Sequence, residues 1–362
     1  MFLTLLNKSY NLKITNQVNN LLHLPGIIFF MLRAFRLQKQ FIIKHLEPHL
    51  KSIDSQKSGE ISHLELKKIR QYYGFAVPAI LGEAFYLLRE GSMKKNERLA
   101  LTYLGAATGL YDDFFDDLKT SEAHIRELTI NPAESSAQNL RESLFIRFYK
   151  LAINHAQNPD LIKQRALDVF EAQLRSKKQQ EASISEQEIR SITYLKGSLS
   201  LLFYRSALDE AIPESEENML CALGQLLQLE NDIFDVYKDR QNNIKTLVTD
   251  THQIKNIRET YHNLIQEIIS LLKLCPFKSK NKRLFMRFMG LTIIRGLVCL
   301  DCLEKNEQLT NNTFIVKDYE RNQLVCDMEM LKNFYQMIRY YSQFDMSLLS
   351  KPIQKHTQKS HS

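Results

Sequence analysis

Residues 109–117 read Gly109-Leu110-Tyr111-Asp112-Asp113-Phe114-Phe115-Asp116-Asp117, and residues 228–239 read Gln228-Leu229-Glu230-Asn231-Asp232-Ile233-Phe234-Asp235-Val236-Tyr237-Lys238-Asp239. Both stretches carry carboxylates inside segments that otherwise have the hydrophobic pattern of buried helices. An unpaired carboxylate is costly to bury unless a cation compensates its charge. Two such acidic patches in one chain indicate a shared cation site held by a helical frame.

The composition predicts an all-helical fold. The chain has 362 residues, 44% of them hydrophobic, and only 11 Gly and 8 Pro interrupt it. Long runs with 3.6-residue hydrophobic periodicity predict a single all-α bundle. We expect an N-terminal helical extension over 1–55, the principal domain over 56–350 and a disordered tail over 351–362. Within the principal domain we expect helices at 61–89, 96–119, 137–156, 160–178, 185–209, from Pro213 through the second patch, 250–274, 281–305 and 317–342.

The N-terminal region has two interpretations. Met1–Leu6 is apolar, but Lys8 follows and no small-residue cleavage site appears, so we expect no signal peptide. The apolar run Leu21–Phe35 is shorter than the roughly 20 residues that cross a bilayer. It is either an ordinary packing helix or a helix that rests on a membrane surface. Its basic residues are Arg33, Arg36, Lys39 and Lys44. We expect a cytoplasmic protein, peripheral to the membrane under the second interpretation.

The net charge and the cysteine content argue against a nucleic-acid-binding protein and against a disulfide-bonded one. The net charge is +7, but the basic residues are scattered and the acidic patches would repel phosphodiesters, so we expect no nucleic-acid partner. The five cysteines lie mostly in apolar helical stretches, which indicates reduced thiols. Cys299-Leu300-Asp301-Cys302 has the CxxC spacing, yet no second pair accompanies it.

A helical wheel places the carboxylates of each patch together. At about 100° per residue, Asp112, Asp113, Asp116 and Asp117 span about 140° of one helix. Gly105, Thr108 and Gly109 lie on the same side, which predicts open space for a long ligand. In the second patch the residues Asn231, Asp235 and Asp239 form an i, i+4, i+8 ladder, with Gln228 and Gly224 on its face.

Either helix alone could be a solvated acidic face. Such faces usually interleave Lys at i+4, however, and the carboxylates of the first patch would repel one another. Oxygen ligands of this kind suit Mg²⁺ held partly by substrate phosphates. We therefore expect Mg²⁺ to be bound by Asp112, Asp113, Asp116, Asn231, Asp232, Asp235 and Asp239.

Both patches resemble motifs of one family. Residues 109–117 resemble the first DDxxD motif of class I isoprenoid synthases. Residues 223–239 resemble the second motif in three branches at once: trans-prenyltransferases, squalene and phytoene synthases, and terpene cyclases. The resemblance implies an all-α bundle around an apolar cavity, about three Mg²⁺ ions and a prenyl diphosphate substrate (farnesyl, geranylgeranyl or longer). In that reading Asp112, Asp113, Asp116, Asn231, Asp235 and Asp239 are the catalytic residues.

The resemblance also implies cationic phosphate contacts. Lys196 is similar to the lysine of the prenyltransferase KT position, and Arg339-Tyr340 to the late Arg-Tyr pair of cyclases. Lys238 and Lys245 flank the second patch and either bind diphosphate or simply neutralise the acids. Ala107 and Thr108, at positions that limit chain length in prenyltransferases, are small, so a long chain is expected to fit.

The chain departs from elongating prenyltransferases in one respect. Lys94, Lys95 and Arg98 lie too close to the first patch, and only Arg126 follows it, so a second diphosphate site is poorly supported. We expect an enzyme that ionises one prenyl diphosphate and cyclises or couples the product. The alternatives are squalene- or phytoene-type coupling, chain elongation, and a degenerate prenyl-lipid-binding subunit without activity. The sequence leaves a homodimer open.

Overall fold

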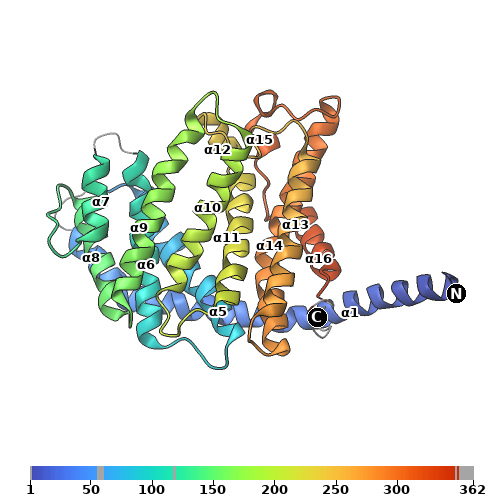
Figure 1. Ribbon diagram of the computed structural model, residues 1–362, viewed down its shortest axis with the longest axis horizontal. Coiled ribbons are helices and arrows are strands. Elements are labelled where there is room, and N and C mark those ends of the chain that lie inside the picture. Colours follow the sequence, from blue (N-terminus) through green and yellow to red (C-terminus); the bar gives the residue numbers. More distant parts are fainter. Residues whose placement is uncertain (1, 55–60, 117–119, 347–348, 350–362) are drawn as a thin grey trace, which may run out of the picture.

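The computed structural model describes residues 2–54, 61–116, 120–346 and 349, and every regular element in those ranges is helical (Figure 1). The predicted all-α fold is confirmed, whereas the predicted tail lies outside the described residues. The elements are α1 (Phe2–His45), α2 (Glu47–Asp54), α3 (His63–Lys67), the π-helix η1 (Lys68–Tyr73), α4 (Gly74–Ala76), the π-helix η2 (Val77–Gly82), α5 (Glu83–Leu88), α6 (Lys95–Asp116), α7 (Glu122–Ile130), α8 (Leu140–His155), α9 (Pro159–Ser176), the 3₁₀-helix η3 (Lys177–Gln180), α10 (Glu186–Arg205), α11 (Glu214–Phe234), α12 (Val236–Gln241), α13 (Ile254–Leu274), α14 (Ser279–Leu309), the 3₁₀-helix η4 (Val316–Asp318), α15 (Arg321–Leu324) and α16 (Leu331–Gln343).

Capping residues fix where several helices begin. Ser121, Asn139, Asn158 and Ser185 each accept a hydrogen bond from the backbone N–H three residues later, and they open α7, α8, α9 and α10. The short helix α7 was not predicted, because it offers too few turns for a periodic pattern. The single helix predicted over 317–342 is wrong, since η4, α15 and α16 are separated there by non-helical residues.

The central helices pack in chain order. Neighbouring contacts join α6 to α8, α9 to α10, α10 to α11, and α11 to α13 and α14, and Figure 1 shows α10, α11, α13 and α14 side by side. A Cβ added at Gly197 would lie 2.2 Å from the carbonyl oxygen of Gly224, and one at Gly224 would lie 2.3 Å from that of Gly197. The two backbones therefore touch, which brings α10 unusually close to α11.

Helix α1 is longer than the predicted apolar run and is not detached from the bundle. It runs along the lower side of the bundle in Figure 1, where its N-terminal part projects beyond the other helices, and it contacts α2, α4, η2, α14 and α16. Ile27, Ile42 and Leu46 belong to the same hydrophobic core as the central helices. One side of the predicted extension thus packs on the principal domain.

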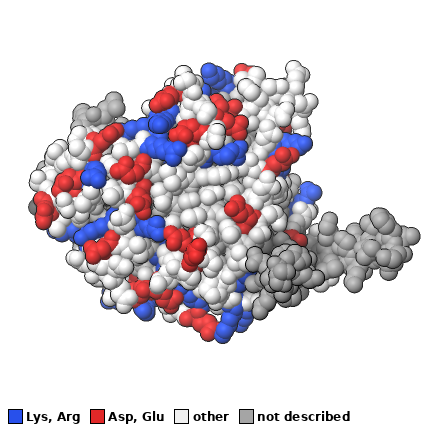
Figure 2. Space-filling view, in the orientation of Figure 1, with Lys and Arg blue, Asp and Glu red and all other residues white. Residues whose placement is uncertain are grey.

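Charges of both signs are mixed over the visible surface. On the face shown in Figure 2, Lys and Arg are interspersed with Asp and Glu. Nucleic-acid-binding faces usually gather basic residues instead. This face therefore adds no support for a nucleic-acid partner.

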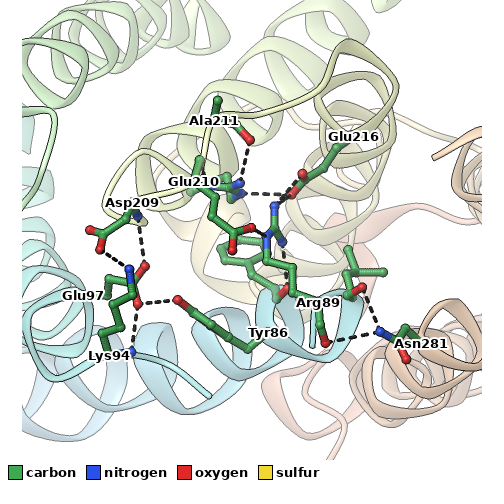
Figure 3. A network of polar contacts seen from close by, with 12 residues as sticks. Tyr86, Arg89, Lys94, Glu97, Asp209, Glu210, Ala211, Glu216 and Asn281 are labelled. Atoms are coloured by element: carbon green, nitrogen blue, oxygen red, sulfur yellow. Dashed lines mark hydrogen bonds and ion pairs between the residues drawn. The ribbon is translucent and has the colours of Figure 1, made fainter. Parts of the chain in front are cut away.

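A buried ionic network joins the ends of α5 and α10 to the start of α11 (Figure 3). The carboxylate of Glu216 accepts hydrogen bonds from Arg89 Nη2 at 2.6 and 2.7 Å and from Arg205 Nε at 2.9 Å. The side chains of Arg205 and Glu216 are fully buried. Glu97 accepts hydrogen bonds from the Tyr86 hydroxyl and from the backbone N–H groups of Lys94 and Asp209. All these partners lie within the fold and satisfy one another, so we assign the network to stability.

Candidate functional site

The first acidic patch occupies the last turns of α6. Asp112 accepts hydrogen bonds from the Tyr73 hydroxyl at 2.8 Å and from Gln173 Nε2 at 3.1 Å. Asp113 Oδ1 pairs with Lys68 Nζ at 2.5 Å, while its buried Oδ2 has no hydrogen-bond partner in the described part of the chain. Burial is the main cause that raises the pKa of Asp112. The side chain of Asp116 and all of Asp117 fall outside the described residues.

Of the small residues before the patch, Gly105 and Gly109 do not leave the open space that was predicted. A Cβ at Gly105 would meet the carbonyl oxygen of Tyr73 at 2.4 Å, and one at Gly109 would meet the backbone of Ile69 at 3.3 Å. The π-helix η1 fills this side of α6, because glycine lets its backbone approach. The glycines therefore bring Lys68 and Tyr73 to the carboxylates instead of admitting a ligand.

Three contacts of the patch were not predicted: Lys68, Tyr73 and Gln173. Lys68 and Tyr73 lie in a helical run without a motif, and Gln173 belongs to the separate helix α9. The one available signal was the i, i+4 spacing of Gly105 and Gly109, which is typical of a close helix contact as well as of a cavity floor.

The second patch is split between two helices. Asp232, near the end of α11, is buried and accepts hydrogen bonds from Thr193 Oγ1 at 3.2 Å and Gln228 Nε2 at 3.0 Å. Asp235 has φ −91° and ψ 8°, which ends α11, and α12 begins at the next residue. The ladder predicted for one straight helix is therefore interrupted at Asp235. Asn231 is exposed, and Asp239 is buried.

Burial raises the pKa of the second-patch carboxylates. It is the main cause of a pKa of about 6 for Asp232 and about 7 for Asp239, and the charge of Asp235 raises both further. The site therefore holds acids whose ionised forms lack full compensation within the protein. A bound cation would supply it.

Lys196 lies on α10, whose Gly197 touches the α11 backbone and whose Thr193 donates to Asp232. Its charge lowers the pKa of Asp112 on α6, of Asp232 on α11 and of Asp239 on α12. The pKa of Tyr73 is raised chiefly by the charge of Asp112 and also, more weakly, by that of Asp235. These cross-patch effects require the patches to lie near one another. Lys196 is half-buried and forms no ion pair with any described residue.

An apolar cavity opens beside Asp112. The cavity has a volume of about 50 Å³ and lies between α6, α7, α8, α9 and α10. Ala107 and Thr108 line it, and the buried Tyr149 hydroxyl there has no hydrogen-bond partner among the described residues. The remaining lining side chains are Tyr111, Asp112, Thr129, Phe145, Ala166, Val169, Gln173, Ser200, Phe203 and Tyr204.

The other predicted phosphate ligands lie in different surroundings. Lys238 is largely exposed, with its Nζ 3.9 Å from Asp235 Oδ2. Lys245 Nζ donates to the carbonyl oxygen of Ala182 at 2.8 Å and lies 3.6 Å from Asp250.

The predicted Arg-Tyr pair belongs to α16. Arg339 is exposed, and the Tyr340 hydroxyl donates to Asp301 Oδ1 at 2.6 Å while accepting from Arg258 Nη1 at 3.2 Å. Asp301 and Arg258 come from α14 and α13, so Tyr340 joins three helices through an ionic cluster of its own. No contact in the described residues links this pair to the acidic patches.

The donor set suits Mg²⁺ bound jointly with a phosphate. Among the described residues, no three His, Cys, Asp or Glu side chains converge as a ready-made metal site. Mg²⁺ is usually bound by one or two carboxylates together with substrate phosphates, so such a cage is not required. The partnerless Asp113 Oδ2 and the raised pKa values of Asp112, Asp232 and Asp239 mark oxygens that a cation would compensate.

Comparison with protein-family models, with curated proteins and with solved structures finds no match for this chain. The functional evidence is therefore the site itself: two acidic patches, a half-buried lysine whose charge acts on carboxylates of both, and an apolar cavity alongside.

Proposed function

We propose that the chain is a Mg²⁺-dependent enzyme of the class I isoprenoid synthase type, which ionises a prenyl diphosphate and cyclises or couples the resulting carbocation. The observation that carries the proposal is the place of Lys196 on α10: it follows by one turn Thr193, whose hydroxyl donates to Asp232, and its charge acts on carboxylates of both patches. A diphosphate needs cationic partners, and a prenyl chain needs a dry apolar wall. Asp112, a carboxylate that could bind such a cation, also lines the apolar cavity.

Asp112 and Asp113 from α6, with Asp232, Asp235 and Asp239 from the α11–α12 junction, would hold Mg²⁺, joined by Asn231 and Asp116 as the sequence predicts. When bound, Mg²⁺ supplies Lewis-acid stabilisation of the charge on the departing diphosphate.

The chain's own residues bind, orient and exclude water. Lys196 binds phosphate oxygens, while Tyr73 and Gln173 hold Asp112 in one orientation through their hydrogen bonds. Lys68 does the same for Asp113. The cavity wall keeps water from the allylic cation, and ring faces such as those of Phe203 and Tyr204 stabilise positive charge.

The proposal places the enzyme in the cytoplasm, in peripheral contact with membranes that store its hydrocarbon-rich substrate and product. Squalene- or phytoene-type coupling and chain elongation use the same ionisation step and remain its alternatives. A binding subunit without activity would have no use for carboxylates from both patches around one lysine.

The test is release of diphosphate by the purified protein. Geranyl, farnesyl and geranylgeranyl diphosphates would each be offered with and without isopentenyl diphosphate, in Mg²⁺ or in EDTA. We expect Mg²⁺-dependent release that Asp113→Asn abolishes. Asp160→Asn is the matched control, because Asp160 is 92% exposed on α9, and it should leave the rate unchanged.

Mass spectrometry of the products separates cyclisation, coupling and elongation. If the folded wild-type protein released no diphosphate from any substrate, or no more than Asp113→Asn does, the enzymatic proposal would be overturned.

A further inference from the structure

Helix α1 has an unbalanced charge. Over Phe2–His45 it contains no Asp or Glu, whereas it carries Lys8, Lys13, Arg33, Arg36, Lys39 and Lys44. The part Thr15–His45 is also long and apolar enough to cross a membrane by length and composition alone, yet little of it is buried in the bundle. Such a helix spans a membrane, lies on one, or covers a protein surface.

Polar contacts along one side hold α1 against the bundle. The buried Gln38 Nε2 donates to the carbonyl oxygen of Gly74 and to Thr102 Oγ1, both at 3.0 Å. Asn20 Nδ2, also buried, donates to the carbonyl oxygen of Phe344 at 2.7 Å. A spanning helix would have to break these contacts and expose both amides to lipid. The structure therefore argues against spanning.

The opposite side of α1 is apolar and exposed. At about 100° per residue, five large side chains fall within about 80° of one another on the helical wheel. They form what we call the α1 apolar stripe: Val18, Leu22, Phe29, Leu32 and Ile43, which are 51, 74, 71, 57 and 61% exposed. Arg36 falls at the centre of the stripe on the same wheel, between Leu32 and Ile43. An exposed, mainly apolar surface of this kind marks a contact with a partner.

Unpaired positive charge surrounds the stripe. Arg33, Arg36, Lys39 and Lys44 are exposed, and none forms an ion pair with a described residue. On the neighbouring helix α14, Arg283 and Arg287 lie near enough to His23 to lower its pKa, although burial contributes more. Arg287 is buried, so the exposed positive charge of this surface comes from the four basic residues of α1. The partner of this surface is therefore anionic.

We propose that α1 rests on an anionic lipid bilayer, with the α1 apolar stripe inserted among the acyl chains and the flanking Lys and Arg side chains at the headgroup phosphates. Interfacial helices combine these two features. A second copy of the chain fits less well, because its α1 would bring the same unbalanced positive charge. A nucleic acid would leave the apolar stripe unburied. This inference does not depend on the chemistry proposed above.

The test is co-sedimentation of the full-length protein with vesicles of phosphatidylcholine alone, or of phosphatidylcholine mixed with phosphatidylglycerol. We expect binding to the mixed vesicles that weakens as salt is added. Arg36→Gln with Lys39→Gln should lower the partition coefficient about thirty-fold at low salt. Leu22→Gln with Phe29→Gln should lower it about a hundred-fold.

Matched controls lie elsewhere on the surface. Leu309→Gln, at an exposed position that ends α14 (77%), and Lys255→Gln, on α13 with a 77% exposed side chain, should bind as the wild type does. Circular dichroism verifies that each variant is folded.

Three results would overturn the proposal. One is a folded protein that binds neither kind of vesicle, or binds both equally whether or not the stripe is intact. Another is a dimer in light scattering that Leu22→Gln with Phe29→Gln dissociates, because the stripe would then be covered by a second copy. The last is binding that survives alkaline carbonate extraction, which indicates a spanning helix.

Discussion

The Tyr73 hydroxyl donates a 2.8 Å hydrogen bond to Asp112 Oδ2 and so ties the π-helix η1 to the last turns of α6. This bond lowers the pKa of Asp112 and thereby opposes the effect of burial. Tyr73, 39 residues away in the sequence, thus favours the ionised form of the Asp112 carboxylate.

Replacing Tyr73 by Phe should therefore make the site less active at low pH. Without the hydroxyl the pKa of Asp112 rises, so a larger fraction is protonated and unable to bind a cation. We expect the acidic limb of the pH–rate profile for diphosphate release to move to higher pH, with about a tenfold loss of kcat/KM at neutral pH. Tyr103→Phe is the control, because its hydroxyl bonds to the His45 carbonyl oxygen. An unmoved acidic limb would count against this role of Tyr73.

Lys196 should matter more than the other predicted lysines. Lys196→Met removes a phosphate ligand and also the charge that lowers the pKa of Asp112, Asp232 and Asp239. We expect kcat/KM for diphosphate release to fall about a hundredfold or more, with partial recovery in Lys196→Arg.

Lys238→Met and Lys245→Met serve as comparisons, since Lys238 is exposed and Lys245 is engaged with a backbone carbonyl oxygen. Losses as large in either variant as in Lys196→Met would contradict this ranking of the three lysines.

The sequence indicated those site residues that lie together in one short stretch of the chain. Both acidic patches and Lys196 could be proposed from the sequence, because each lies in one short stretch with a recognisable spacing, although the structure divides the second patch between α11 and α12. Tyr73 could not, because its place depends on the contact between Gly105 and the Tyr73 carbonyl oxygen, which joins two separate helices. The break at Asp235 was also missed, since a helical wheel assumes a straight helix.

In the fold, too, the sequence predicted the long elements better than the short ones. Long periodic helices such as α10 and α14 were predicted nearly to their ends, because hydrophobic periodicity continues through them. The segment 317–342 was predicted as one helix, but Asp327 and its neighbours form turns between α15 and α16. Composition alone did not separate these short elements.

The raised pKa values of Asp232 and Asp239 make the metal-free protein less stable as pH rises. Each folded-state pKa, about 6 and about 7, lies above the value of about 3.9 for an unfolded chain. Their contribution to stability is therefore fully present below about pH 4 and is lost as pH rises through 6 to 7. We expect the melting temperature in EDTA to fall between about pH 5 and pH 8.

Mg²⁺ should restore stability most at the upper end of this range, because it binds the ionised carboxylates. Differential scanning calorimetry with and without Mg²⁺ measures both effects. Asp239→Asn should flatten the pH dependence, and Asp160→Asn should not. A melting temperature that rises with pH in EDTA would show that other groups dominate.

Glu216 should contribute to the stability of the fold and take no part in catalysis. Glu216→Ala leaves Arg205 fully buried without its carboxylate partner and removes a partner of Arg89. Breaking a buried pair in this way costs about 3–5 kcal/mol. Urea unfolding measures the loss, with the exposed Glu259→Ala as control. A loss below about 1 kcal/mol, the usual value of surface pairs, would mean that water reaches the network.

The width of the cavity should set the length of the preferred substrate. Val169, half-buried on α9, lines the cavity, so Val169→Phe fills space that a prenyl chain would use, whereas Val169→Ala enlarges it. We expect Val169→Phe to lower kcat/KM for the longest accepted prenyl diphosphate about a hundredfold while affecting the shortest little, since a few methylene groups decide such selectivity. Val169→Ala should shift the preference the other way. Equal effects of both variants on all chain lengths would place the prenyl chain outside this cavity.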